Sequence, residues 1–169
     1  MTRTPALALL LISAACAPRK TTVPPPSDPS SGAADDSAAA VALERKPCLG
    51  GCPVYRISVS PEGVVSYEGE AGVRHLGAAT KRIKPEQVLA LVSELERAGY
   101  FSFAPRYTPG EPACGRYATD SPTAVMSVST GTRSHRVEHD YGCSSAPGGL
   151  VVLERRIDEA LGSSEWTGR

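Results

Sequence analysis

Residues 54–68 read Val-Tyr-Arg-Ile-Ser-Val-Ser-Pro-Glu-Gly-Val-Val-Ser-Tyr-Glu, and this stretch decides the fold. Its first six residues alternate, with the tyrosine, the isoleucine and the second valine on one face, as in a strand that buries one side. Residues 60–63 then place proline second and glycine fourth in a β-turn. Because residues 64–68 continue as a second strand, the stretch predicts an antiparallel hairpin.

The segments that follow this hairpin predict more strands and then a helix. Residues 73–76 and 80–83 are interpreted as two shorter strands, which would extend the hairpin into a meander of about four strands. A helix is expected to begin at Pro85, where a missing N–H costs nothing, and to end at Gly99 as a left-handed cap.

A second hairpin and a second helix complete the pattern. Residues 123–129 alternate, and residues 133–140 are expected to pair with them across a turn at Gly131. Apolar side chains three and four positions apart, from Leu150 to Leu161, predict the second helix. Since each helix needs a sheet face to cover its apolar stripe, we predict a two-layer α+β domain with an antiparallel sheet and both helices on one face.

The amino-terminal region has the pattern of an export signal followed by a tether. Residues 1–15 combine an arginine, a short apolar run and small residues, as in a signal peptide. Cys16 follows at the position that a bacterial lipoprotein signal acylates, although Ser13 stands where such signals usually carry a large aliphatic residue. Residues 16–44, rich in proline, alanine and serine, predict a disordered tether, and the folded domain is expected over residues 45–166.

Charge and hydropathy narrow the class of protein. The chain has 169 residues with 18 Lys+Arg against 18 Asp+Glu, and this balance argues against a nucleic-acid partner. Its apolar runs are shorter than the roughly 18 residues that a membrane-spanning helix needs.

From the signal pattern we expect an exported protein of the cell envelope, with a lipid on Cys16 in the membrane and the domain in the periplasm or at the cell surface. A cleaved soluble protein with a free Cys16 thiol is the alternative.

The cysteines are the strongest chemical signal. Five is an odd number, and a lipid on Cys16 would leave an even set of four. In an exported chain cysteines form cross-links more often than metal sites. Three pairings are open, and we favour Cys48–Cys52, which encloses two glycines, and Cys114–Cys143, which flanks the second hairpin. A zinc site built from all four is the alternative, although the usual Cys-x2-Cys spacing is missing.

The polar candidates favour a structural role over catalysis. Asp120 precedes a strand and is expected to fix its loop by accepting backbone N–H bonds. The alternative is a hydrolase in which Asp120 works as a general acid or base with His139 or Asp140. His135 and His139 are expected to be exposed on a strand about 13 Å apart, too far to share a metal ion. No cofactor is predicted.

A candidate binding surface lies in and near the long loop of residues 104–119. Long loops held against a rigid sheet often carry function, and tyrosine and arginine are enriched at binding hot spots. The expected partner is an unidentified envelope protein or ligand, and the alternative is a loop that only covers the sheet edge. The candidate residues are Tyr107, Arg116, Tyr117, Asp120 and Tyr141.

Four short motifs follow one another in the order of a known family. They are Cys-x3-Cys-Pro-x-Tyr at 48–55, Gly-Val-Val-Ser-Tyr-Glu-Gly at 63–69, Thr-Asp-x-Pro at 119–122 and Tyr-Gly-Cys at 141–143. With them the chain resembles bacterial domain of unknown function 6438, a family often found in exported or lipid-anchored proteins. The resemblance implies one small α+β domain in the envelope and brings no catalytic residues. The sequence therefore predicts a lipoprotein that carries a disulfide-stabilised interaction or structural module.

Replacing Cys16 with serine tests the lipid anchor. In a bacterial host grown with a fatty-acid probe, we expect the natural chain to be labelled and Cys16→Ser to be unlabelled, because the lipid is attached through the cysteine. The measurement is in-gel detection of the probe on the purified chain. Equal labelling of the two chains would contradict the anchor.

Overall fold

The structure is a computed structural model that describes residues 40–169. The predicted signal peptide (1–15), the lipidation site Cys16 and the tether up to residue 39 lie outside the described residues. Among the helices of residues 40–169, none combines the length and the hydropathy needed to cross a bilayer.

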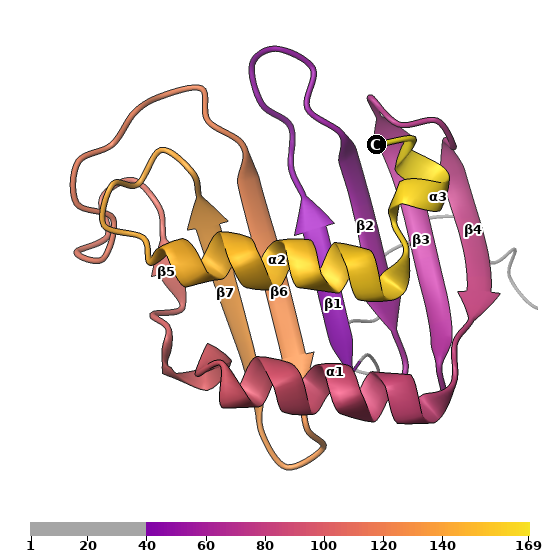
Figure 1. Cartoon of the computed structure of the whole chain (residues 1–169). Coiled ribbons are helices and arrows are strands. Elements are labelled where there is room, and N and C mark those ends of the chain that lie inside the picture. The colour runs from indigo at the N-terminus through magenta and orange to yellow at the C-terminus, as the bar shows by residue number, and fades with distance from the viewer. Residues whose placement is uncertain (1–39) are drawn as a thin grey trace, which may run out of the picture. The chain divides into compact units, whose positions relative to one another are not determined.

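A seven-stranded sheet forms one layer of the domain, in the order β4-β3-β2-β1-β6-β7-β5 (Figure 1). Neighbouring strands are antiparallel, except that β5 runs parallel to β7. The strands are β1 (Val41–Arg45), β2 (Val54–Val59), β3 (Val64–Ala71), β4 (Gly77–Arg82), β5 (Arg106–Tyr107), β6 (Thr123–Ser129) and β7 (Ser134–Asp140).

Two helices cross one face of this sheet and form the second layer (Figure 1). They are α1 (Pro85–Arg97) and α2 (Gly148–Leu161), and a short α3 (Ser164–Thr167) follows α2. A 3-10 helix, η2 (Tyr100–Ser102), follows α1. The predicted α+β class and the mainly antiparallel sheet are confirmed, but the sheet is larger than the predicted meander.

The hairpin of residues 54–68 forms as predicted. β2 pairs antiparallel with β3, and the Gly63 N–H donates to the Ser60 carbonyl at 2.9 Å to close the turn. Gly63 has a φ of +82°, and a Cβ there would lie 2.1 Å from the Ile83 carbonyl oxygen. The turn therefore requires glycine. Gly99, also with positive φ, follows Ala98, the C-cap residue of α1, close to where the sequence placed the end of the helix.

The predicted boundary between tether and domain is wrong for residues 40–44. β1 occupies the middle of the sheet, where it pairs with β2 on one side and β6 on the other. Val41 and Leu43 are fully buried. The strand was missed because it continues an alanine run and has only two large apolar side chains in alternation. Its stability comes from neighbours distant in sequence, which a local pattern does not contain.

Two smaller expectations also need correction. Residues 73–76 form no strand, and a single strand, β4, takes the place of the two short ones. Residues 77–79, which separate the two expected strands, are themselves paired with β3. The loop of residues 104–119 contains the two-residue strand β5, which extends the sheet edge beyond β7.

A row of large side chains crosses the sheet beneath the helices. The register places Leu43 of β1 opposite Ile57 on one side and Met126 on the other, and all three are fully buried. The Tyr100 hydroxyl donates to the Met126 carbonyl at 2.9 Å, which ties the segment after α1 to the sheet. The helices cover this row with Val88, Leu91 and Leu95 from α1, and Leu150, Leu153, Ile157 and Leu161 from α2.

Truncation of the central strand tests the corrected boundary. We expect Leu43→Ala to lower the free energy of unfolding by about 2–5 kcal/mol, because it leaves a cavity at the centre of the core. Urea denaturation followed by circular dichroism measures the change. The matched control is Leu89→Ala in α1, whose side chain is 66% exposed and whose loss should cost little. Equal stability of the Leu43→Ala and natural chains would contradict the central place of β1.

Candidate functional site

A cavity of about 410 Å³ opens where β1 ends and β2 begins. The β1–β2 loop and α3 lie at this same end of the sheet (Figure 1). The β1–β2 loop, the start of β6, the last turns of α2 and the segment around α3 all contribute to its lining. Apolar wall is provided by Cys52, Pro53 and Pro122, and hydroxyl groups by Thr123, Ser163, Ser164 and Thr167.

A disulfide closes the loop on one side of the cavity. Cys48 and Cys52 are bonded, with their Cα atoms 5.6 Å apart. Gly50 and Gly51 both have positive φ, so the small ring uses backbone conformations that other residues rarely adopt. The ring restricts the loop between β1 and β2, and the loop residues that line the cavity are therefore held in place without a ligand.

Arg45, the last residue of β1, lines the cavity. Its Nη2 donates to Asp158 Oδ2 at 2.7 Å, and its Nε lies 3.1 Å from both Asp158 Oδ2 and the Tyr55 hydroxyl. Tyr55 in turn donates to Asp158 Oδ1 at 2.6 Å. Both carboxylate oxygens of Asp158 are therefore occupied by groups from the sheet, and α2 is held over the ends of β1 and β2.

A second carboxylate extends this network under α2. Arg45 Nη1 donates to the Tyr141 hydroxyl at 3.2 Å, and Tyr141 donates to Glu154 Oε2. The other oxygen, Oε1, lies 2.7 Å from His139 Nδ1. Glu154 is fully buried, and Arg45 Nη1 also lies 3.7 Å from its Oε2. A buried carboxylate needs such partners because an unpaired charge is costly in the interior.

Burial and neighbouring charges determine the protonation states of Tyr141, Tyr55 and Arg45. Burial raises the pKa of Tyr141 to about 12, and Glu154 adds to the effect. Burial and then the Asp158 carboxylate raise the pKa of Tyr55 above its usual value. Burial, the largest single effect, lowers the pKa of Arg45, but Asp158, Tyr55 and Tyr141 together outweigh it, and the pKa of Arg45 is raised. At neutral pH the phenols are therefore donors and Arg45 is charged.

Sequence reasoning missed Glu154 and Asp158. A signal for Glu154 was present, because it stands four residues after Leu150 and three before Ile157, on the buried stripe of α2. An acidic residue on such a stripe indicates a buried polar partner. Its partner His139 lies on β7, and local spacing does not identify that contact.

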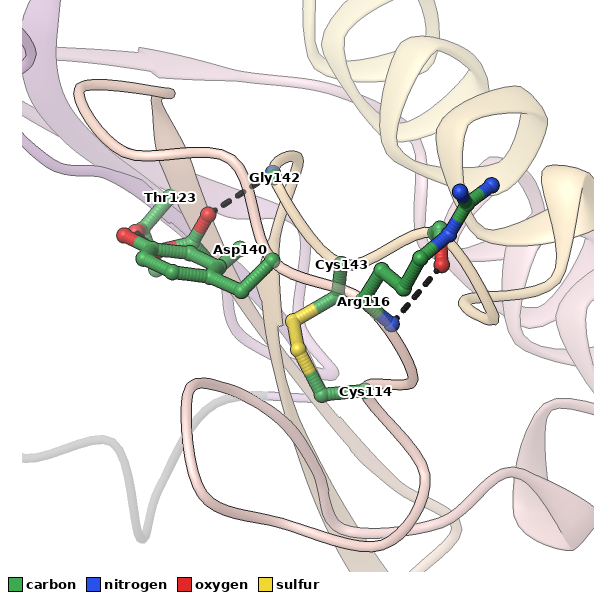
Figure 2. The surroundings of a disulfide bond; sticks show 8 residues. Cys114, Arg116, Thr123, Asp140, Gly142 and Cys143 are labelled. Carbon is green, nitrogen blue, oxygen red and sulfur yellow. Dashed lines mark hydrogen bonds between the residues drawn. A yellow bond between two sulfur atoms is a disulfide. The ribbon is translucent and has the colours of Figure 1, made fainter.

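Both predicted disulfides are present. Besides Cys48–Cys52, the structure bonds Cys114 to Cys143, with Cα atoms 4.5 Å apart (Figure 2). The two bridges leave no thiolate among these four cysteines, so the alternative zinc site has no ligands in the structure. No group of three or more metal-binding side chains occurs within residues 40–169.

The residues of the predicted binding surface lie in three different places: the core, the cavity and an exposed loop. Tyr107 is buried, and its hydroxyl accepts the Ala104 N–H at 3.0 Å. Tyr141 lines the cavity. Arg116, Tyr117 and Asp120 remain in the exposed loop near the second bridge, where Tyr117 is 41% exposed.

Asp140 joins that loop to the sheet. It accepts the Gly142 N–H at 2.8 Å, and the hydroxyls of Tyr117 and Thr123 lie 3.3 and 3.4 Å from its other oxygen (Figure 2). On the other side of the bridge, the Arg116 N–H donates to the Ser144 hydroxyl at 3.0 Å (Figure 2). Close to Cys114, the loop is therefore fixed by a covalent bond and by hydrogen bonds from Arg116 and Tyr117.

Asp120 has a different local role from the one predicted. Its backbone is left-handed, with a φ of +66°, and its carboxylate accepts the Thr119 hydroxyl at 3.1 Å in place of a backbone N–H. Among the hydrogen bonds and ion pairs of residues 40–169, none joins Asp120 to His139 or Asp140. The hydrolase alternative therefore lacks its contact in this structure.

The prediction that both strand histidines are exposed is wrong. His139 is 3% exposed, since it bonds Glu154 and its ring stacks on Tyr141 with centroids 4.6 Å apart. His135 is half-buried, with Nε2 3.0 Å from the Phe103 carbonyl oxygen. Both lie on the face of β7 that the helices cover, which alternation along the strand alone does not reveal.

The comparison with known proteins agrees with the motif pattern. The family model described as Domain of unknown function (DUF6438) matches residues 39–161, which span nearly the whole sheet and both long helices. The chain belongs to the DUF6438 family. The match begins before β1, in accord with the corrected boundary of the domain. No curated protein matches the chain.

The two disulfides should differ in their reaction with thiols. Cys48 and Cys52 are half-buried, whereas Cys114 and Cys143 are 1% and 5% exposed. Because an attacking thiolate must reach a sulfur atom, we expect dithiothreitol to open Cys48–Cys52 several-fold faster in the folded protein. Alkylation at timed intervals followed by peptide mass mapping measures both rates, and urea-unfolded protein is the control. Faster opening of Cys114–Cys143 would contradict the accessibility argument.

Proposed function

We propose that this DUF6438 protein is a lipid-anchored protein of the bacterial envelope whose folded domain is a binding module. Its ligand site is the cavity above Arg45. The observation that carries this proposal is the preformed cavity itself, lined by a cross-linked loop and by an arginine that four neighbouring side chains hold in place.

The size and chemistry of the cavity support this function. Its volume of about 410 Å³ is within the range of small-molecule sites, roughly 300–1,000 Å³. Such sites combine apolar walls with a few convergent polar groups, and here Pro53 and Pro122 lie beside Arg45 and several hydroxyls. Since Arg45 is already oriented, little conformational entropy is lost when a ligand binds.

The state of Asp158 and Glu154 favours binding over catalysis. A general base needs an oxygen within hydrogen-bond reach of the proton that it removes. Asp158, an acidic residue of the lining, has both oxygens bonded to Arg45 and Tyr55. Glu154 is fully buried between Tyr141 and His139. These carboxylates are therefore committed to holding the site together.

The location in the envelope rests on the first sixteen residues and on the disulfides. A signal-like segment that ends at Cys16 supports export and lipid attachment. Two disulfides are in keeping with an oxidising compartment, because cytosolic thiols are kept reduced. On this proposal the tether presents the domain away from the membrane.

A second candidate site is the exposed loop near Cys114–Cys143. Arg116 and Tyr117 are exposed there on a segment that a disulfide and hydrogen bonds hold against the sheet. These residue types are common at protein interfaces. The loop would then receive a protein partner, independently of the cavity.

Filling the cavity tests the proposed site. We expect a library of small fragments, screened by NMR against the full chain, to shift the amide resonances of Lys46, Thr123 and Ser164. Ser164→Trp should abolish these shifts without unfolding the domain, because Ser164 is exposed and its enlarged side chain would fill the cavity.

The matched control is Ser134→Trp, at an exposed position in β7 that does not line the cavity. It should leave the fragment-induced shifts unchanged. Fragments that instead shift the amide resonances of Arg116 and Tyr117 would favour the loop as the binding site. Fragments that bind the Ser164→Trp chain as tightly as they bind the natural chain would disprove the cavity site.

A further inference from the structure

We propose that the cavity selects an oxyanion, a carboxylate or phosphate carried on an organic body, which Arg155 binds together with the remaining N–H groups of Arg45. This inference rests on the proposed function, because it names the class of ligand for the same cavity. It is based on a comparison of the charged side chains in the lining: some already have an ionic partner, and others do not.

Cations outnumber acids in the lining of the cavity. Four basic side chains contribute, against the two acids Asp158 and Glu159. Asp158 is neutralised by Arg45, and Lys46 donates to Glu138 at 2.7 Å. The basic residues are Arg45, Lys46, Arg155 and Arg169.

Arg155 differs from its neighbour Arg156 in having no ionic partner. Arg156 Nε donates to both carboxylate oxygens of Glu94 on α1, at 2.9 and 3.1 Å. Arg155 is exposed and lines the cavity, and no hydrogen bond or ion pair of its side chain occurs within residues 40–169. Adjacent arginines on one helix thus have different roles, one joining the helices and one facing the cavity.

Arg45 has donors left for a ligand. A guanidinium carries five N–H groups. Within the described part of the chain, the hydrogen bonds of Arg45 use Nε–H, one N–H of Nη1 and one N–H of Nη2. Two N–H groups remain, and the side chain lines the cavity and is 20% exposed. Arg45 therefore has N–H groups left for an acceptor that enters the cavity.

An oxyanion fits these donors better than a cation or a sugar. The planar fork of a guanidinium matches the geometry of carboxylate and phosphate oxygens, and charged hydrogen bonds are stronger than neutral ones. A cation would meet Arg155 and Arg45 directly. A sugar commonly stacks on an open aromatic face, but Tyr55 is only 3% exposed. Pro53 and Pro122 offer apolar wall for the organic body of the ligand.

Glu159 is the group that opposes this ligand. It lines the cavity four residues after Arg155, on the same side of α2, and forms no ion pair with it. Its negative charge repels an incoming oxyanion. Removing that charge should therefore strengthen binding, which a merely structural role of α2 does not predict.

The experiment titrates the full chain with benzoate, phenyl phosphate and benzamide, and follows the cavity resonances by NMR. Benzamide has nearly the shape of benzoate but no charge. We expect both anions to bind more tightly than benzamide, and Arg155→Gln to weaken the anions about tenfold, the loss of one charged hydrogen bond. Arg156→Gln is the matched control and should leave affinity unchanged, whereas Glu159→Gln should raise it several-fold.

The outcomes separate this inference from the proposed function. A preference for phenyl phosphate or for benzoate identifies which oxyanion the site takes, and either supports the inference. Benzamide binding as tightly as benzoate, or an Arg155→Gln chain with unchanged anion affinity, would overturn the oxyanion while leaving the cavity as a ligand site. If none of the three probes shifts the cavity resonances, the oxyanion inference fails, and if the fragment library shifts none either, the proposed function fails with it.

Discussion

A half-buried arginine at the end of the central strand, Arg45, determines how the two layers of this domain fit together. Apolar side chains alone would let α2 slide along the sheet at little cost, because many leucine and isoleucine contacts are interchangeable. Arg45 removes that freedom, since its charge is satisfied only where Asp158 and Glu154 both reach it. Leaving the fully buried Glu154 carboxylate without its partners would cost about 3–5 kcal/mol. The ion network therefore specifies one register of helix on sheet.

The same register positions the walls of the cavity. Tyr55 joins Asp158 to β2 and stacks on Tyr67 of β3, with ring centroids 5.7 Å apart. Tyr67 stacks in turn on Trp166 of α3 at 4.9 Å, and Lys81 of β4 lies over that indole. The segment that carries Ser163 and Ser164 is thus anchored through three aromatic rings to the sheet. Core packing therefore continues directly into the lining of the cavity.

Local sequence patterns predicted the parts of this molecule whose partners are near in the chain. The hairpin of residues 54–68, the stop of α1 before Gly99 and the small Cys48–Cys52 ring all depend on neighbours within a few positions. β1 was missed because its stability comes from strands on both sides that are distant in sequence. The site was only partly anticipated: Tyr141 lies in it, but Tyr107 is in the core, and the Glu154–His139 contact joins a helix to a strand.

Arg45 serves both stability and recognition, whereas other residues of the site act in recognition alone. Arg45 and Tyr55 are held from several sides and belong to the structure that joins the layers. Arg155, Glu159 and Ser164 line the same cavity from exposed positions and have no part in the buried core. A substitution at these exposed positions changes the charge or shape that a ligand meets while costing little folding free energy. The domain is therefore a scaffold on which the choice of ligand can change without rebuilding the fold, as expected when a binding site lies at the edge of a rigid sheet.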